Sequence, residues 1–254
     1  MRGANFLALD VETANQSPAS ICQVGGCVYV DGEETDCFSW LINPEADFHP
    51  RNVAIHGITE SDTARQAAFR DVQSDLIEWM EGTVVLSHGS FDRTALTAAF
   101  NAHGTALPSF TWVDSCELVK AAWPEFSSRG YGLKPTAERL GIQFDHHDAL
   151  QDARTAGLVA IAAITTLNLP FGNAVKRYGR PFVQAMRSPL TTAKQQTRDR
   201  ERSTIELKLP PLFTDDQMEL LACYASMPPD LKRVYLAAGR DALERWNAAA
   251  EQAT

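Results

Sequence analysis

The 254-residue sequence has no long apolar run and few cysteines. A membrane-spanning helix needs about 20 predominantly apolar residues in succession, so no membrane span is expected. The five cysteines form no Cys-x-x-Cys pair, which disfavours a zinc site, and their odd number predicts free thiols. The first predicted strand starts so early that no signal peptide fits before it. These absences favour a soluble protein in a reducing compartment, and we expect it to be cytoplasmic.

An overall excess of positive charge is also absent, because the net charge is −9. The charge is unevenly distributed: residues 1–170 carry 10 Lys and Arg against 22 Asp and Glu, whereas residues 171–210 carry 9 against 3. An acidic body can still bind a polyanion, because local patches and bound metal ions set the field at a site. The basic segment either guides nucleic acid or is a solvated linker.

The order of apolar patterns predicts an α/β protein. Strands are expected at residues 5–12, 21–30, 36–42, 83–88 and 110–115, and helices at residues 67–80, 91–104, 116–123, 133–141 and 148–168. The first three strands follow one another and indicate an antiparallel meander, whereas the later strands alternate with helices. This order predicts a mixed five-stranded sheet flanked by helices.

Three segments are expected along the chain. The α/β domain is predicted to cover residues 1–170, and residues 171–212 are predicted to form a basic connecting segment. Thr214 and Gln217 have capping-box spacing and begin a pattern of two helices. Residues 213–254 are therefore predicted to form a C-terminal helical hairpin.

Four acidic residues stand where apolar elements begin or end. Asp10 and Glu12 close the apolar stretch FLALDVET, and residues two apart on a strand share a face. Asp92 follows a strand-to-helix turn, and Asp152 lies in the first turns of an Ala-rich helix. Each acid taken singly is explained by an ordinary structural role, but one sheet can bring all four to its carboxyl edge. Buried like charges raise each other's pKa, and a divalent cation between them removes that cost.

Four carboxylates without a nearby cysteine predict oxygen ligation of Mg²⁺ or Mn²⁺. Such a site suits phosphoryl transfer or phosphodiester hydrolysis with two metal ions, and a nearby histidine suits general base catalysis. His147 can take this role if it lies on a loop before Asp148, the expected N-cap, because on one regular helix it would diverge from Asp152. His146 is an alternative base.

The acidic stretches together resemble the motifs of the DEDDh 3′–5′ exonucleases, a DnaQ-like class that includes the proofreading epsilon subunit of bacterial replicative polymerase and ribonuclease T. FLALDVET resembles the first motif, SHGSFD the second and HHDALQDA the third. The resemblance covers residues 4–168. It implies a ribonuclease H-like fold and a hydrolase that removes nucleoside 5′-monophosphates from the 3′ ends of single-stranded nucleic acid, as in proofreading or DNA repair.

The resemblance also implies roles for single residues. Asp10, Glu12, Asp92 and Asp152 would bind two divalent ions, Mg²⁺ or Mn²⁺, and His147 would be the general base. These five residues form the predicted catalytic set.

The same resemblance implies a place for the terminal nucleotide. The backbone around Thr13 and Ala14 would hold it, and His56, His88 and Phe91 would lie nearby. Two departures from the family pattern affect this part of the site: Thr-Ala-Asn stands where Thr-Thr-Gly is commoner, and His88 stands where Asn is common.

The sequence leaves several alternatives open. Single-stranded DNA is the expected substrate, but RNA is not excluded, because discrimination of the 2′-OH depends on pocket shape. A catalytically silent nucleic-acid-binding module and a metal-dependent phosphatase on small phosphate esters are the other candidate functions. Trp40 and Phe48 either stack on bases or pack in the core. A polymerase or another protein partner and the oligomeric state also stay open.

Overall fold

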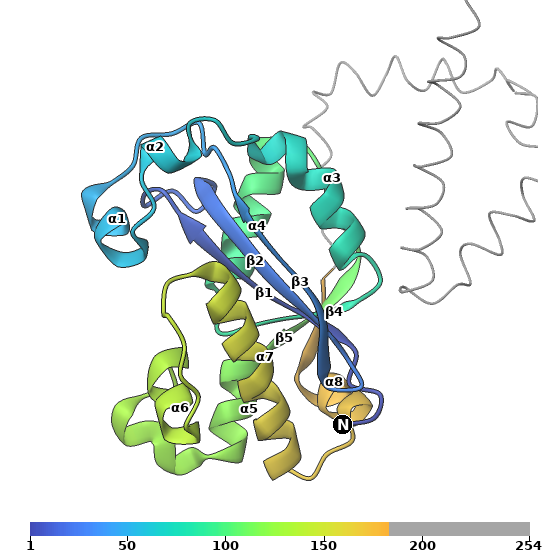
Figure 1. The fold of residues 1–254 in the computed structure, drawn as a ribbon. Helices are drawn as coiled ribbons and strands as arrows, with labels where there is room; N and C mark the ends of the chain where they lie inside the picture. The colour runs from blue at the N-terminus through green and yellow to red at the C-terminus, as the bar shows by residue number, and fades with distance from the viewer. Residues whose placement is uncertain (183–254) are drawn as a thin grey trace, which may run out of the picture. The chain divides into compact units, whose positions relative to one another are not determined.

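The computed structural model describes residues 1–182, which form a twisted sheet with helices on both faces (Figure 1). Contacts along the chain divide it into two units, Met1–Arg187 and Ser188–Thr254. The predicted C-terminal helical hairpin and most of the predicted connecting segment lie outside the described residues.

The sheet is mixed, as predicted. Its strands are β1 (Phe6–Thr13), β2 (Ile21–Val30), β3 (Glu33–Leu41), β4 (Val84–Ser87), β5 (Phe110–Asp114) and β6 (Gly179–Phe182). The strand order is β3-β2-β1-β4-β5-β6. β1, β2 and β3 form the predicted antiparallel meander, β4 and β5 run parallel to β1, and β6 is antiparallel to β5.

The prediction of five strands was one strand short. β6 has only four residues and contains Pro181, so it shows no alternating apolar pattern that sequence reasoning could detect. It is held at the edge of the sheet by pairing with β5 and by the Phe182 ring, which stacks on Phe110 at 4.9 Å. The predicted boundary after residue 170 thus leaves out a helix and a strand of the first unit.

The five helices predicted within residues 1–182 are present. The helices are α1 (Pro50–His56), α2 (Glu60–Thr63), α3 (Phe69–Met80), α4 (Phe91–Ala102), α5 (Ser115–Ala122), α6 (Leu133–Leu140), α7 (Ala149–Thr166) and α8 (Phe171–Tyr178). A 3₁₀ helix at Pro124–Arg129 follows α5. Within the part of the chain that the structure describes, no single helix is long and apolar enough to cross a membrane. α7 and α8 reach that length and apolar content together, but they are bent by 103° at their junction.

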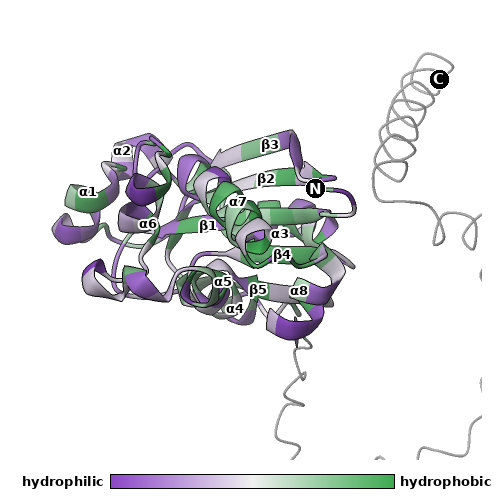
Figure 2. Cartoon of the chain, turned by 90° about the horizontal axis from the view of Figure 1, so that it is seen from below, coloured by the Kyte–Doolittle hydropathy of each residue, from purple (hydrophilic) through white to green (hydrophobic). Residues whose placement is uncertain are grey.

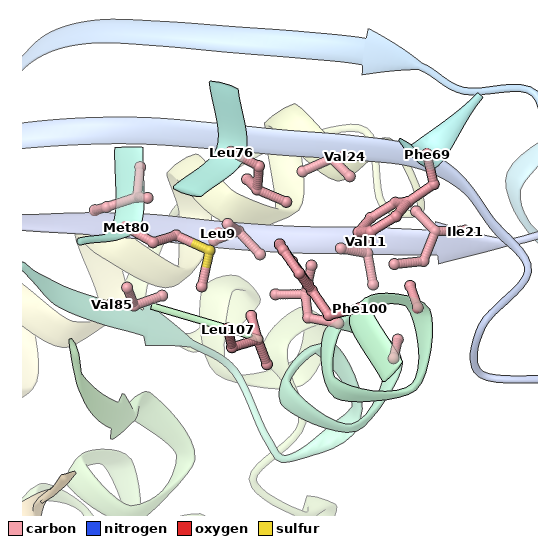
Figure 3. Close-up of a cluster of buried hydrophobic side chains, with 14 of the residues drawn as sticks. Leu9, Val11, Ile21, Val24, Phe69, Leu76, Met80, Val85, Phe100 and Leu107 are labelled. Carbon is pink, nitrogen blue, oxygen red and sulfur yellow. The ribbon is translucent and has the colours of Figure 1, made fainter. Parts of the chain in front are cut away.

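β1 is apolar on both faces because helices cover both. Leu7, Leu9 and Val11 point into one buried cluster with side chains of α3 and α4, which Figure 3 shows around Phe100. Phe6 belongs to a second cluster on the opposite face, with side chains of α5 and α7. Each fully buried aliphatic side chain contributes about 1.5–3 kcal/mol, so the central strand is firmly held where its two acids project.

Helix α7 packs unusually close to the sheet, and it is largely hydrophobic (Figure 2). A Cβ atom at Gly25 would lie 2.2 Å from the Ala149 carbonyl carbon, and one at Gly157 would lie 2.5 Å from the Tyr29 ring. The Tyr29 hydroxyl donates to the Arg154 carbonyl oxygen at 3.0 Å. Gly25 therefore lets the first turn of α7 lie directly against β2, and Gly157 does the same for the middle of the helix.

Candidate active site

The structure brings the four predicted acids together at the carboxyl edge of the sheet. Asp10 and Glu12 project from β1, Asp92 lies in the first turn of α4, and Asp152 lies in the first turn of α7. Carboxylate oxygens of Asp10, Glu12 and Asp152 lie within 4.8 Å of one another. Asp92 hydrogen-bonds to the Asp10 side chain and accepts from the Val11 N–H at 3.1 Å. Three elements that are distant in sequence thus build one acidic centre.

Burial and mutual repulsion keep protons on this centre. Burial raises the pKa of Asp10 well above its usual range, and the charges of Asp92, Asp152 and Glu12 raise it further. Burial, followed by the charges of Asp152 and Asp92, raises the pKa of Glu12 to about 8. Burial also raises the pKa of Asp92 to about 7, although hydrogen bonds from backbone N–H groups oppose that shift.

This donor set fits a divalent cation. The converging atoms are carboxylate oxygens, which Mg²⁺ and Mn²⁺ prefer. Asp92 and Asp152 are 2% and 4% exposed, and buried acids at such distances are stable as anions only next to positive charge. A cation among them would offset both the burial and the mutual repulsion that raise these pKa values.

Two histidines lie over the acids, on the loop before α7. Asp148 is the N-cap of α7, as predicted, since its Oδ1 accepts from the Gln151 N–H at 3.0 Å. His147 therefore lies outside the helix, and its φ of 75° turns the loop back over the acids. Its Nδ1 lies 3.9 Å from Glu12 Oε1. The condition that the sequence set for His147, a loop position before the cap, is met.

His146 contacts a different acid. Its Nδ1 lies 3.0 Å from both carboxylate oxygens of Asp152, and its ring stacks on the His147 ring with centroids 3.8 Å apart. The His147 N–H also donates to Asp152 Oδ2 at 3.2 Å. Burial, and next the neighbouring His146, lower the pKa of His147, so His147 is neutral and can accept a proton near pH 7.

A buried glutamine, which sequence reasoning missed, fixes the start of α7. Gln23 lies on β2 opposite Glu12 and is 5% exposed. Its Oε1 accepts from the Ala149 N–H at 3.1 Å, and its Nε2 donates to Asp148 Oδ2 at 3.1 Å. Gln23 thus ties the helix that carries Asp152 to the strand beside Glu12. An amide inside the apolar stretch ICQVGGCVYV was the available signal, because a buried polar side chain requires a partner.

The predicted nucleotide-binding backbone is held by neighbouring side chains. The Thr13 carbonyl oxygen accepts from Asn52 Nδ2 at 2.8 Å and lies 3.2 Å from His56 Nε2. His56 Nδ1 accepts from the Ile58 N–H, so Nε2 carries the proton and donates to Thr13. Ala14 is fully buried, and both of its backbone groups are hydrogen-bonded within the protein. His56 and Asn52 therefore shape the backbone at the end of β1.

His88 and Phe91, the other two residues predicted to contact the substrate, differ in how accessible their side chains are. His88 Nδ1 lies 2.8 Å from Ser115 Oγ, and its Nε2 lies 2.7 Å from the Tyr131 carbonyl oxygen. Both ring nitrogens are thus engaged with the protein, and burial lowers the pKa of His88. Phe91 is 51% exposed at the start of α4, so its ring is open to a base.

Trp40 and Phe48, for which base stacking and core packing were both open, pack against buried clusters. Trp40 stacks on Phe38 with ring centroids 4.3 Å apart and packs against the cluster that contains Leu9. Phe48 packs against the small cluster around Ile58. Core packing therefore accounts for both.

Comparisons with known proteins show which family the chain resembles. The family model RNase_T, described as an exonuclease, matches residues 7–160. The chain is 28% identical over 177 residues to the 3′-5′ exonuclease DinG of Bacillus subtilis (strain 168), a match that covers 67% of this chain and 19% of DinG. It is 26% identical over 179 residues to Exodeoxyribonuclease 10 of Escherichia coli (strain K12), covering 68% of this chain and 74% of that protein. The chain therefore spans only a small part of DinG and most of the second relative.

A solved structure shows the same fold. The nuclease domain of 3′hExo, a DEDDh family member bound to rAMP, has a TM-score of 0.56 and 20% identity, and the match covers 65% of this chain and 94% of that domain. The similarity supports the ribonuclease H-like fold for the described sheet and helices.

Proposed function

The chain belongs to the exonuclease family whose model matches residues 7–160, of the DEDDh, DnaQ-like type, and from this premise we propose that it is a metal-dependent 3′–5′ exonuclease. It hydrolyses the terminal phosphodiester bond of single-stranded DNA and releases nucleoside 5′-monophosphates. One observation carries the proposal: carboxyl groups from β1, α4 and α7 converge beneath two histidines at the carboxyl edge of the sheet.

Asp10, Glu12, Asp92 and Asp152 would hold the metal ions, which we propose to be two Mg²⁺ or Mn²⁺. Ions bound by such a set lower the pKa of water and stabilise charge on the leaving oxygen. The chain contributes rigidity: two of the ligands stand on the central strand, and the others lie in first turns of packed helices. Such elements hold ligands with better precision than loops do.

His147 accepts the proton of the attacking water in this proposal. Its side chain is 41% exposed, its lowered pKa keeps it neutral, and its ring lies near Glu12. His146 has its Nδ1 directed at Asp152 and therefore holds that carboxylate in place. The exposed Phe91 ring offers a face on which the terminal base can stack.

DNA is the proposed substrate because of one relative's own name. The Escherichia coli relative is named an exodeoxyribonuclease, which supports DNA, whereas the name of DinG, a 3′-5′ exonuclease, supports only the direction of cleavage. The 3′hExo domain is bound to rAMP, so RNA is the comparison that the experiment must include.

The test is hydrolysis of matched DNA and RNA oligonucleotides, labelled at the 5′ end, with Mg²⁺, with Mn²⁺ and with EDTA. We expect a ladder that shortens from the 3′ end only when metal is present, with nucleoside 5′-monophosphates as products and faster cleavage of DNA. A protein that binds oligonucleotides but releases no mononucleotide with either metal would be a silent binding module. Hydrolysis of a phosphate monoester, with the oligonucleotide left intact, would indicate a phosphatase.

A further inference from the structure

A hollow of about 250 Å³ lies apart from the acidic centre, between the N-terminal end of α4, β5 and the end of α8. These elements lie toward the β5 end of the sheet (Figure 2). Three arginines, Arg93, Arg177 and Arg180, and two aromatic residues, Trp112 and Tyr178, contribute to its lining. None of the five belongs to the site described above.

The hollow keeps an excess of positive charge. Within residues 1–182, its three arginines form no ion pair with a carboxylate. The two acids on its border are engaged elsewhere. Asp114 Oδ1 accepts from the N–H groups of Gly89 and Cys116, each at 2.8 Å. Glu117 pairs with Lys120 at 2.6 Å. The guanidinium groups are thus available to an anion from outside.

Two of the residues that line the hollow also carry a buried neutral donor without an acceptor among the described residues. Trp112 is 3% exposed, and its buried Nε1–H and the buried Tyr178 hydroxyl have no hydrogen-bond partner in the part of the chain that the structure describes. Trp112 and Arg180 are paired across β5 and β6, so their side chains share a face of the sheet. Folded proteins satisfy nearly all buried donors. Unpartnered donors beside arginines therefore indicate a ligand that supplies acceptor oxygens.

We propose that this hollow binds a phosphate of the substrate's backbone, away from the bond that is cleaved. Guanidinium groups bind phosphate oxygens in a bidentate manner, and indole N–H and phenol O–H groups can donate to the same oxygens. The inference rests on the proposed function, because the strand must also enter the acidic centre. β5 is separated from β1 only by β4, which is about 10 Å at the usual strand spacing. At the stacked spacing of about 3.4 Å per nucleotide, a nucleic acid strand covers that distance with about three nucleotides.

The first experiment measures oligonucleotide binding in EDTA, where hydrolysis cannot interfere. Arg177→Ala combined with Arg180→Ala is compared with Arg2→Ala combined with Lys176→Ala. The control pair removes the same charge from exposed positions that do not line the hollow. For a 12-nucleotide DNA, we expect the arginine pair to lose about tenfold in affinity and to flatten the slope of log affinity against log salt by about 0.7, one phosphate contact. A dinucleotide is too short to show the difference.

A second variant removes only a donor. Trp112→Phe deletes the unpartnered N–H and keeps an aromatic ring, so we expect affinity for the 12-nucleotide DNA to fall about threefold, since a neutral hydrogen bond contributes little. The melting temperature should fall by a few degrees, because the smaller ring leaves a cavity in the core. A purely structural role of the indole N–H would leave DNA affinity unchanged.

Inorganic phosphate and a nucleoside 5′-monophosphate are titrated against the same proteins to identify the source of the phosphate. If the Arg177→Ala/Arg180→Ala variant loses affinity for these two small ligands but not for the 12-nucleotide DNA, the hollow binds a free phosphate and the backbone assignment is wrong. The assignment also fails if the arginine pair and the control pair bind the 12-nucleotide DNA equally. If the wild-type protein hydrolyses DNA but the two double variants bind the 12-nucleotide DNA equally, only this inference is contradicted. Wild-type protein that neither binds nor hydrolyses DNA contradicts the proposed function as well.

Discussion

The two regions at the carboxyl edge of the sheet present opposite electrostatic situations. At the end of β1, four carboxyl groups converge, and burial raises the pKa of Glu12 to about 8. At the end of β5, three arginines border a hollow without carboxylate partners among the described residues. The first region is stable with a cation and the second with an anion. A nucleic acid strand accompanied by metal ions would satisfy both at once.

The largest expected effect comes from breaking the acidic region. Asp10→Asn keeps the size of the side chain but removes a metal ligand from the central strand, so we expect DNA hydrolysis to fall about 1,000-fold or more. Without metal, the Asp10→Asn variant should be at least as stable as the wild-type protein, because one of the mutually repelling acids is gone. Mononucleotide release and thermal unfolding measure the two effects.

Asp145→Asn is the matched control for this change. Asp145 is exposed on the loop that precedes His146 and makes no part of the acidic group. We expect the control to hydrolyse DNA within about twofold of the wild type, as surface substitutions usually do. Wild-type activity in Asp10→Asn would show that hydrolysis does not depend on the acidic centre.

A smaller loss is expected from His147→Ala. Loss of a general base costs about 100-fold or more. Burial and His146 lower the pKa of His147, so with saturating metal the wild-type rate should fall only as the pH drops below about 6.5, where the imidazole becomes protonated. The variant should lose this acidic limb of the pH profile, measured as kcat between pH 5 and 8.

His146→Ala separates the two histidines. It releases Asp152 from its contact with Nδ1 and should lower the rate while leaving the acidic limb in place. If the limb vanishes in His146→Ala and persists in His147→Ala, His146 is the base.

Much of the fold could be predicted because its signals are local. The apolar run before Asp10 and the helical spacing of residues 67–80 and 148–168 each mark one element. β6 escaped prediction because its four residues are held by pairing with β5, and such tertiary pairing leaves no pattern in a short segment.

The candidate site was partly predictable for a related reason. The acids could be named because charge inside an apolar pattern is conspicuous, as at Asp10 and Asp152. The contacts of His88 with Ser115 and Tyr131 depend on how distant segments pack. The hollow around Trp112 also depends on β6, so no prediction that lacked this strand could have found it.

Removing Gln23 should have a moderate effect that is confined to the acidic region, because only the start of α7 loses its hydrogen bonds to β2. Gln23→Leu leaves the Ala149 N–H and one Asp148 oxygen without their partner, a cost of about 1–3 kcal/mol for a buried group. We expect a lower melting temperature and about a tenfold loss of kcat, since small misplacement of reacting groups is costly. DNA affinity in EDTA should change little.

Gln73→Leu provides the same chemical change on α3, where the buried Gln73 Oε1 has no hydrogen-bond partner within residues 1–182. It should leave kcat and the melting temperature close to the wild type. Equal losses of kcat in the two variants would show that Gln23 does not position α7.

The smallest effect concerns pH, and it distinguishes the two regions directly. The folded-state pKa values of Glu12 and Asp92, about 8 and about 7, lie above those of unfolded Glu and Asp, near 4. The folded protein therefore binds more protons between about pH 4 and pH 8, and stability falls as the pH rises through that window. Without metal, we expect the melting temperature to drop by about 5 °C from pH 6 to pH 8.5, and Mn²⁺ should reverse the drop. Glu12→Gln should flatten the dependence of the melting temperature on pH.

Arginine does not titrate in this range, so the difference in DNA affinity between Arg177→Ala/Arg180→Ala and its control should be equal at pH 6 and pH 8.5. A melting temperature that rises with pH in metal-free protein would show that the acids are not protonated, and the contrast between the two regions would then fail.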